Sequence, residues 1–122
     1  MEILVAAFDY IPSYESVDFI DEGTELIIEE QYEEEPGWVV CSTADGQCKG
    51  WFPLGIIEKN EGRLILRETF SPDELEIYKG EYIIKISEES GRYYVMNSRN
   101  EKGWIPKMIV NVAAVLGNSE EK

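Results

Sequence analysis

Carboxylates and aromatic rings are the groups in this sequence most able to do chemistry. The chain has 25 Asp and Glu against 11 Lys and Arg, and no histidine. The commonest general base and metal ligand is therefore missing. No Ser or Cys lies in a recognisable nucleophile motif, no glycine-rich loop precedes a helix, and the Glu33-Glu34-Glu35 run lacks calcium-loop spacing. We expect a protein that is not an enzyme and holds no metal or cofactor.

The acidic charge is concentrated in the first half of the chain. Residues 1–60 hold 14 acids and 2 bases, whereas residues 61–122 hold 11 acids and 9 bases. An acidic surface repels phosphate backbones, so we expect no nucleic-acid partner. Two interpretations stay open: the charge keeps the protein in solution, or it attracts a basic partner.

The sequence shows no membrane or export signal. No apolar run approaches the roughly 20 residues of a membrane span. The N-terminus lacks a basic region followed by a small-residue cleavage site. We therefore expect a cytoplasmic protein that does not bind membranes.

The two cysteines, Cys41 and Cys48, flank a turn through Asp45-Gly46 and could face one another on a hairpin. In a protein without an export signal we expect both to be small, reduced, hydrophobic side chains. A disulfide between them is the alternative.

The chain repeats one small module. Gly50-Trp51-Phe52-Pro53 returns 53 residues later as Gly103-Trp104-Ile105-Pro106, and Glu22-Gly23-Thr24 returns as Lys79-Gly80-Glu81. The repeat predicts modules at residues 1–59 and 63–113, a tail at 114–122, and Asn60-Glu61-Gly62 as the linker. Because three residues span only about 10 Å, the modules should pack in a fixed relation.

Short, β-branched and aromatic segments separated by turn residues predict an all-β fold. No segment has a sustained apolar period of 3.6 residues, so we expect two consecutive small five-stranded barrels. The expected strands are at 3–10, 24–30, 38–41, 50–52 and 56–57, and then at 64–66, 82–86, 92–96, 104–106 and 109–110.

These features resemble the Src-homology-3 (SH3) domain. Ala6-Ala7-Phe8-Asp9-Tyr10 is similar to the family's Ala-Leu-Tyr-Asp-Tyr opening, and Gly37-Trp38 resembles its binding-face tryptophan. Gly50-Trp51-Phe52-Pro53 followed by Ile56-Ile57 resembles its Gly-x-x-Pro-x-x-Tyr-Val ending. The resemblance covers residues 2–59 and, less fully, 63–112.

The resemblance implies an adaptor-like protein whose first barrel binds a Pro-rich or otherwise extended basic peptide. Such a peptide is already extended and loses little conformational entropy on docking. Trp38 is expected to be exposed on the binding face. Ile56 replaces the family's tyrosine, and Phe8 lacks a hydroxyl, so fewer polar groups would orient the ligand. The implied peptide-binding residues are Phe8, Tyr10, Glu15, Asp18, Glu34, Trp38, Pro53 and Ile56, and their weaker second-barrel equivalents are Glu74, Tyr93, Pro106 and Ile109.

Two other functions remain open. In one, the protein is a structural or assembly protein whose aromatic faces are buried between modules or in an oligomer. In the other, it is an acidic inhibitor that occupies a basic surface of another molecule. Binding that salt abolishes and that does not depend on Trp38 would favour the inhibitor.

Overall fold

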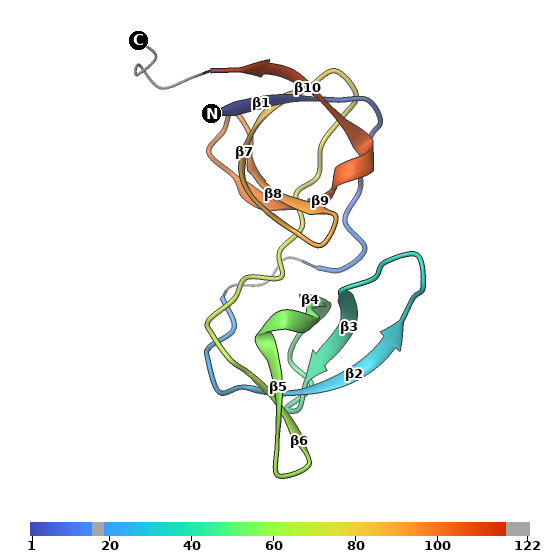
Figure 1. The fold of residues 1–122 in the computed structure, drawn as a ribbon, viewed down its shortest axis with the longest axis vertical. Coiled ribbons are helices and arrows are strands. Elements are labelled where there is room, and N and C mark those ends of the chain that lie inside the picture. The colour runs from blue at the N-terminus through green and yellow to red at the C-terminus, as the bar shows by residue number, and fades with distance from the viewer. Residues whose placement is uncertain (16–18, 117–122) are drawn as a thin grey trace. The chain divides into compact units, whose positions relative to one another are not determined.

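The computed structural model describes residues 1–15 and 19–116. Within these residues the protein is all-β (Figure 1). Two single-turn 3-10 helices, η1 (Leu54–Ile56) and η2 (Lys107–Ile109), each follow a proline. The strands are β1 (Glu2–Ala6), β2 (Glu25–Gln31), β3 (Trp38–Thr43), β4 (Lys49–Pro53), β5 (Ile57–Asn60), β6 (Arg63–Leu66), β7 (Tyr82–Glu89), β8 (Arg92–Met96), β9 (Lys102–Pro106) and β10 (Val110–Val115).

Alternating apolar residues and turn chemistry explain these strands. In β1, Leu4 and Ala6 are buried on one face, while Ile3 and Val5 are half-buried on the other. The predicted β3–β4 hairpin is confirmed, with Gly46 at φ 77° in its turn. The Asp45 carboxylate stabilises this turn by accepting bonds from Thr43 Oγ1 at 2.6 Å and from the Gln47 N–H at 2.9 Å.

The strands form two five-stranded antiparallel sheets, in the orders β10-β1-β7-β8-β9 and β4-β3-β2-β6-β5. They belong to two compact units. Unit 1 combines residues 1–12 with 74–122, and unit 2 comprises residues 13–73. Among the described strands, neither sheet closes on itself, because its two edge strands do not pair with each other.

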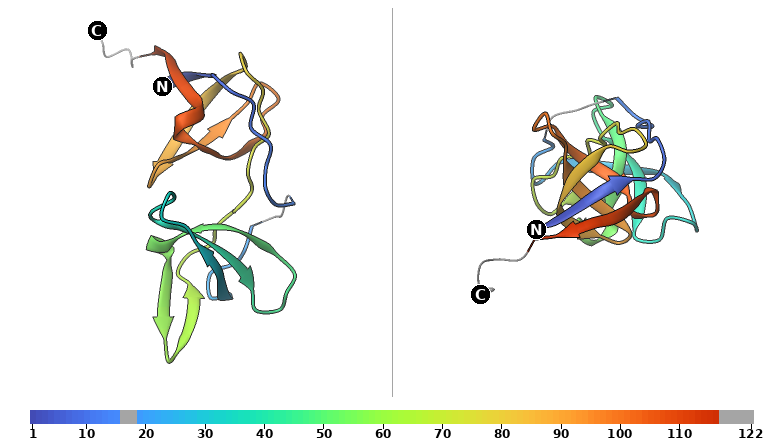
Figure 2. Two further views of the ribbon diagram at one scale, coloured as in Figure 1. Left: turned by 90° about the vertical axis from the view of Figure 1, so that its right-hand side faces the viewer. Right: turned by 90° about the horizontal axis from the view of Figure 1, so that it is seen from above.

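The two sequence repeats have exchanged their first strands. Four strands of each sheet come from one copy of the repeat: β2, β3, β4 and β5 in one sheet correspond to β7, β8, β9 and β10 in the other. Each sheet contains a fifth strand besides these four. In unit 1 that strand is β1, which pairs with β7 and β10; in unit 2 it is β6, which pairs with β2 and β5. Figures 1 and 2 show β1 in blue beside β10, the red-orange strand from the other end of the described chain. Each sheet thus takes one interior strand, next to an edge strand, from the other repeat.

Matched hydrogen bonds confirm this equivalence of β1 and β6. The Ala6 N–H of β1 donates to the Glu81 carbonyl at 2.9 Å. In the same way, the Leu66 N–H of β6 donates to the Thr24 carbonyl at 2.9 Å. Further along, Tyr10 exchanges two backbone bonds with Ile77, and Phe70 exchanges the same two with Ile20.

This topology corrects two expectations from the repeat. The predicted modules at 1–59 and 63–113 differ from the observed units, because residues 1–12 pair with the second half of the chain. Asn60-Glu61-Gly62 is not a linker: Asn60 pairs with Arg63, and Glu61 (φ 54°) and Gly62 (φ 82°) form the tight turn of the β5–β6 hairpin. The chain instead passes between units at two places, after Pro12 and after Asp73.

Each unit has its own core. In unit 1 the core consists of Leu4, Ala6, Leu75, Ile77, Ile83, Tyr93, Val95 and Ile105. In unit 2, Phe70 lies between two other aromatic rings, with its centroid 5.6 Å from that of Phe52 and 6.4 Å from that of Trp38. Leu66 of β6 is also fully buried, so the exchanged strand contributes to this core.

Candidate functional site

Trp38, the residue expected at the centre of the binding face, is buried. Only 1% of its surface is exposed, and its ring packs against Phe70. The prediction of an exposed Trp38 is therefore wrong. Phe70, which follows β6 in the second repeat, supplies an aromatic partner that the predicted first module did not contain.

The predicted first-barrel residues are divided between the units. Phe8 and Tyr10 belong to unit 1, whereas Trp38, Pro53 and Ile56 belong to unit 2. Phe8 is exposed, Tyr10 and Ile56 are half-buried, and Pro53 is buried. Glu15 and Glu34 are exposed in unit 2, and Asp18 lies outside the described residues.

Unit 1 brings the segment that carries Phe8 and Tyr10 together with Ile109, one of the predicted second-barrel residues. The Ala7 N–H donates to the Ile109 carbonyl at 2.8 Å, and Tyr10 and Ile109 pack against one core. The position of Trp38, however, is taken by Arg92 and not by the predicted Tyr93. Arg92 lies opposite Pro106 as Trp38 lies opposite Pro53.

Tyr93 points into the core of unit 1 and is covered by two cations. Its side chain is 7% exposed, with Lys85 Nζ 4.7 Å and Lys107 Nζ 5.8 Å from its ring centroid. Glu88 pairs with both lysines, at 3.5 Å from Lys85 and 3.1 Å from Lys107. Its hydrogen bond with Lys107 keeps the pKa of Glu88 below its ordinary value. Tyr93 thus contributes to the core of unit 1.

Tyr10, Glu74 and Arg92 form a polar group in unit 1 in which the two charged side chains are buried. The Glu74 and Arg92 side chains are 3% and 4% exposed, and Arg92 Nη1 lies 3.4 Å from Glu74 Oε2. The Tyr10 hydroxyl donates to the same oxygen. Burial, and then the hydrogen bond to Glu74, raises the pKa of Tyr10. This bond occupies the hydroxyl proton of Tyr10.

Unit 2 presents a different aromatic surface, which the sequence reasoning missed. The rings of Tyr32 and Trp51 lie with centroids 5.7 Å apart and planes inclined by 45°. Tyr32 is 42% exposed and Trp51 is half-buried. Glu30 lies opposite Val40, and Val40 lies opposite Trp51, so Glu30 and Trp51 share one face of the sheet. We call Glu30, Tyr32, Glu33, Glu34 and Trp51 the acidic aromatic surface.

The electrostatics of unit 2 favour a cationic ligand at this surface. Residues 13–73 hold 15 acids and 4 bases, whereas the rest of the chain holds 10 acids and 7 bases. Arg63 pairs with Glu25 and Arg67 with Glu58, each at 3.8 Å. Among the described residues, no Lys or Arg forms an ion pair with Glu30, Glu33 or Glu34.

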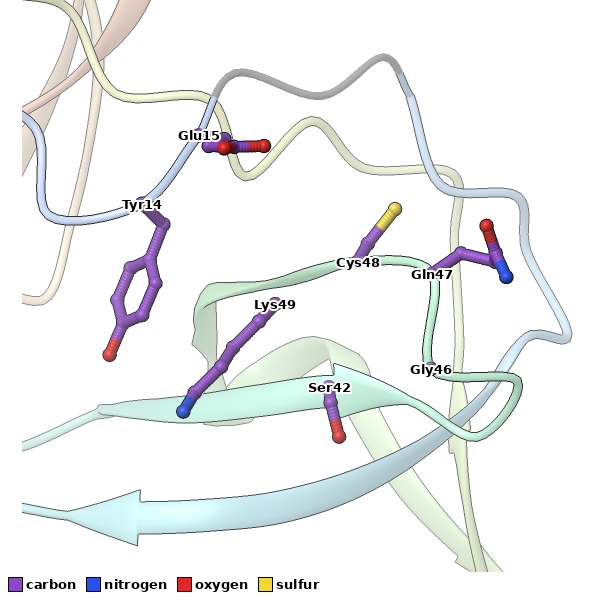
Figure 3. Close-up of a pocket in the computed structure, with 7 residues that line it drawn as sticks. All are labelled: Tyr14, Glu15, Ser42, Gly46, Gln47, Cys48 and Lys49. Atoms are coloured by element: carbon purple, nitrogen blue, oxygen red, sulfur yellow. The ribbon is translucent and has the colours of Figure 1, made fainter.

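A pocket of about 340 Å³ in unit 2 is less suited to such a ligand (Figure 3). Figure 3 shows the Lys49 side chain extending beside Tyr14, with Nζ 5.7 Å from the ring centroid. Lys49 therefore already provides a cation at this ring and would repel another. The residues that line the pocket are Tyr14, Glu15, Ser42, Gly46, Gln47, Cys48 and Lys49.

Both cysteines are free thiols, so the disulfide alternative is not observed. Burial, reinforced by the negative charge of Glu29, raises the pKa of the Cys41 thiol to about 12. Cys41 is therefore protonated and unreactive at neutral pH. Cys48 is half-buried and lines the pocket with Lys49.

Residues 1–15 and 19–116 contain no cluster of three or more His, Cys, Asp or Glu side chains arranged to hold a metal ion. They also contain no helix with the length and hydropathy needed to cross a bilayer. No protein-family model matches the chain, and no curated protein or solved structure matches it significantly.

Proposed function

We propose that the protein is a non-enzymatic interaction module of two SH3-like units, and that unit 2 binds an extended basic segment of a partner protein. The observation that carries the proposal is the Tyr32–Trp51 ring pair, with Glu30 on the same sheet face as Trp51 and with Glu33 and Glu34 following Tyr32 in the sequence. Two features support the SH3-like assignment. The two sheets have equivalent strand orders, and a 3-10 helix follows the Gly-x-x-Pro segment in each unit.

The chemistry of the acidic aromatic surface suits arginine in particular. A guanidinium is planar, stacks on aromatic rings and donates two parallel hydrogen bonds to a carboxylate. Tyr32 and Trp51 offer ring surface, while Glu30, Glu33 and Glu34 offer carboxylates. A segment that is already extended, such as a Pro-rich one, would dock with little loss of conformational entropy.

A fluorescence-anisotropy titration with a labelled nine-residue peptide of alternating Arg and Pro tests the proposal. We expect saturable binding that weakens as salt rises, because exposed charges are screened within about 10 Å at 0.1 M salt. The matched control is the same peptide with Gln in place of Arg, which should not bind. Absence of binding at millimolar concentration, or equal binding of the Gln peptide, would reject a basic ligand.

The burial of Trp38 favours a second candidate, a structural or assembly protein that uses its aromatic residues internally. A side chain that is 1% exposed and packed on Phe70 has no face to offer a peptide. In this case the basic peptide would fail to bind, and the molecular mass in solution would exceed the 14.0 kDa of one chain.

A further inference from the structure

The edge strand β10 differs from the other edge strands of the two sheets. β4 and β9 each begin with Lys and end with Pro, which discourage pairing with a further strand. β5 has only four residues, and Glu58 and Lys59 are two of them. β10 has six residues, Val-Asn-Val-Ala-Ala-Val, without a charge or a proline. Among the four edges described, β10 alone is unprotected.

The uncharged segment extends beyond β10. Residues 108–116, from Met108 to Leu116, carry no charge in a chain of which 30% is charged. Several of its apolar side chains are exposed: Val112 is 54%, Val115 67% and Leu116 49% accessible. On its inner side β10 pairs with β1 from Val110 to Val115, whereas its outer side pairs with no strand of the sheet. Backbone donors and acceptors along that outer side are available to another strand.

The comparison with β5 shows that an SH3-like edge can be protected at this position. β5 and β10 are equivalent, because each is preceded by the same backbone hydrogen bond. Just before β5, the Arg67 N–H donates to the Ile56 carbonyl at 2.7 Å. Just before β10, the Ala7 N–H donates to the Ile109 carbonyl at 2.8 Å. Since one copy of the repeat carries Glu and Lys there and the other carries only uncharged residues, the open edge is a feature of β10 and not of the fold.

We propose that β10 pairs edge to edge with β10 of a second copy of this chain, forming an antiparallel dimer. A two-fold axis places the same segment on both sides, so the interface must be compatible with itself. Residues 108–116 meet this condition in any register, because no pairing of two such segments brings like charges together. A basic partner segment would find no carboxylate on this strand.

The charge distribution also favours pairing through unit 1. Of the chain's net charge of −14, residues 1–12 and 74–122 contribute −3, and residues 13–73 contribute −11. Repulsion between two acidic copies is a long-range effect that salt screens. The dimer should therefore strengthen as salt is added, whereas the basic-peptide complex should weaken. These opposite responses separate the two proposals experimentally.

Sedimentation velocity of the full chain between 10 μM and 1 mM, at low and at 0.3 M salt, tests the dimer. We expect a concentration-dependent shift from the 14.0 kDa monomer to twice that mass, more complete at the higher salt. V112K should weaken dimerisation by about tenfold or more, because it places a like charge on both edges. The control I27K adds the same charge at a residue of similar exposure, 49%, on the central strand β2, and should dimerise like the wild type.

Two further readouts keep the test decisive if V112K is poorly folded. Circular dichroism compares the fold of each variant with the wild type, and V115K repeats the test at a second exposed position of β10. Amide exchange of β10 should also slow with rising protein concentration. A monomer at 1 mM in high salt, or a dimer that neither V112K nor V115K weakens, would overturn the proposal.

Discussion

Ala6 and Leu66 occupy equivalent positions in different units and make the same backbone hydrogen bonds. The Gly80 N–H donates to the Ala6 carbonyl at 2.8 Å, and the Gly23 N–H donates to the Leu66 carbonyl at 2.8 Å. Ala6 lies in β1, which pairs between β10 and β7, and Leu66 lies in β6, which pairs between β5 and β2. The repeats are therefore joined by exchange of an interior strand, and neither repeat contains all five strands of one sheet.

The exchange predicts which fragments fold. Residues 13–73 contain all five strands of the unit 2 sheet, so this fragment should give a dispersed NMR spectrum and cooperative urea unfolding. Residues 1–60 match the sequence repeat but lack β6, which separates β2 from β5, and should be unfolded or associated. A folded, monomeric 1–60 fragment together with an unfolded 13–73 fragment would contradict the exchanged topology.

The Tyr10–Glu74–Arg92 group predicts a large penalty for removing one charge. Arg92→Met should destabilise unit 1 by about 3 to 5 kcal/mol, because it leaves the Glu74 carboxylate buried without its cation. Tyr10→Phe, which removes one hydrogen bond to a charged acceptor, should cost about 1.5 to 3 kcal/mol. Urea unfolding followed by the Trp104 indole resonance measures both.

The double variant Glu74→Leu/Arg92→Met provides the control for this group. It removes both charges, so it should be more stable than Arg92→Met alone. If the two variants are equally stable, or if Arg92→Met costs less than about 1 kcal/mol, the ion pair does not have the role assigned here.

The two repeat glycines predict different responses to the same substitution. A Cβ at Gly103 would lie 2.6 Å from the Leu75 backbone nitrogen and 2.8 Å from the Glu74 carbonyl carbon, which cannot move aside freely. Gly103→Ala should therefore destabilise by about 3 kcal/mol or more. At Gly50 the nearest atom is Pro72 Cβ at 3.2 Å, so Gly50→Ala should cost about 1 kcal/mol or less. Thermal unfolding of the two variants should show this order, and the reverse order would argue against the packing of residues 74–75 on β9.

The Asp45 turn predicts a pH-dependent contribution to stability. The Thr43 hydroxyl, followed by the Gln47 N–H, lowers the pKa of Asp45. A carboxyl group whose pKa is lower in the folded state stabilises the fold above its unfolded pKa, and this contribution disappears as pH falls through the folded value. Asp45→Asn should thus be less stable than the wild type at pH 7, and the difference should shrink towards pH 2. A difference that stays constant over this range would show that the charge is not involved.

The sequence was sufficient for local structure because hydrophobic alternation and turn residues act within one hairpin. It correctly predicted an all-β chain, the β3–β4 hairpin and the strand at Arg92–Met96. It did not predict the exchange, since β1 and β6 are both short apolar strands with the same periodicity, and either could fill either sheet.

The candidate site was harder to predict, because burial depends on which strand fills the sheet. Trp38 is expected at the surface if the first module ends at residue 59, but it belongs to the core once Phe70 is included. The sequence does carry a signal for the Tyr32–Trp51 pair, because Tyr32 directly precedes the glutamate run. Its partner Trp51, however, lies on β4, far from Tyr32 in the sequence. Only the strand register places Glu30, Val40 and Trp51 in one row.

The most direct test of the account is a ¹⁵N NMR titration of the full chain with the Arg-Pro peptide, following the indole N–H peaks of Trp38, Trp51 and Trp104. We predict a saturable shift at Trp51 and none at Trp104. Tyr32→Ala and Glu30→Gln should each weaken binding by about fivefold or more, since cation–π contacts and charged hydrogen bonds are worth about 1 kcal/mol or more. Glu68→Gln, which removes an exposed charge from the same unit, should not weaken binding. Silence at Trp51 up to millimolar peptide, or equal effects of Glu30→Gln and Glu68→Gln, would contradict a defined basic-ligand site on unit 2.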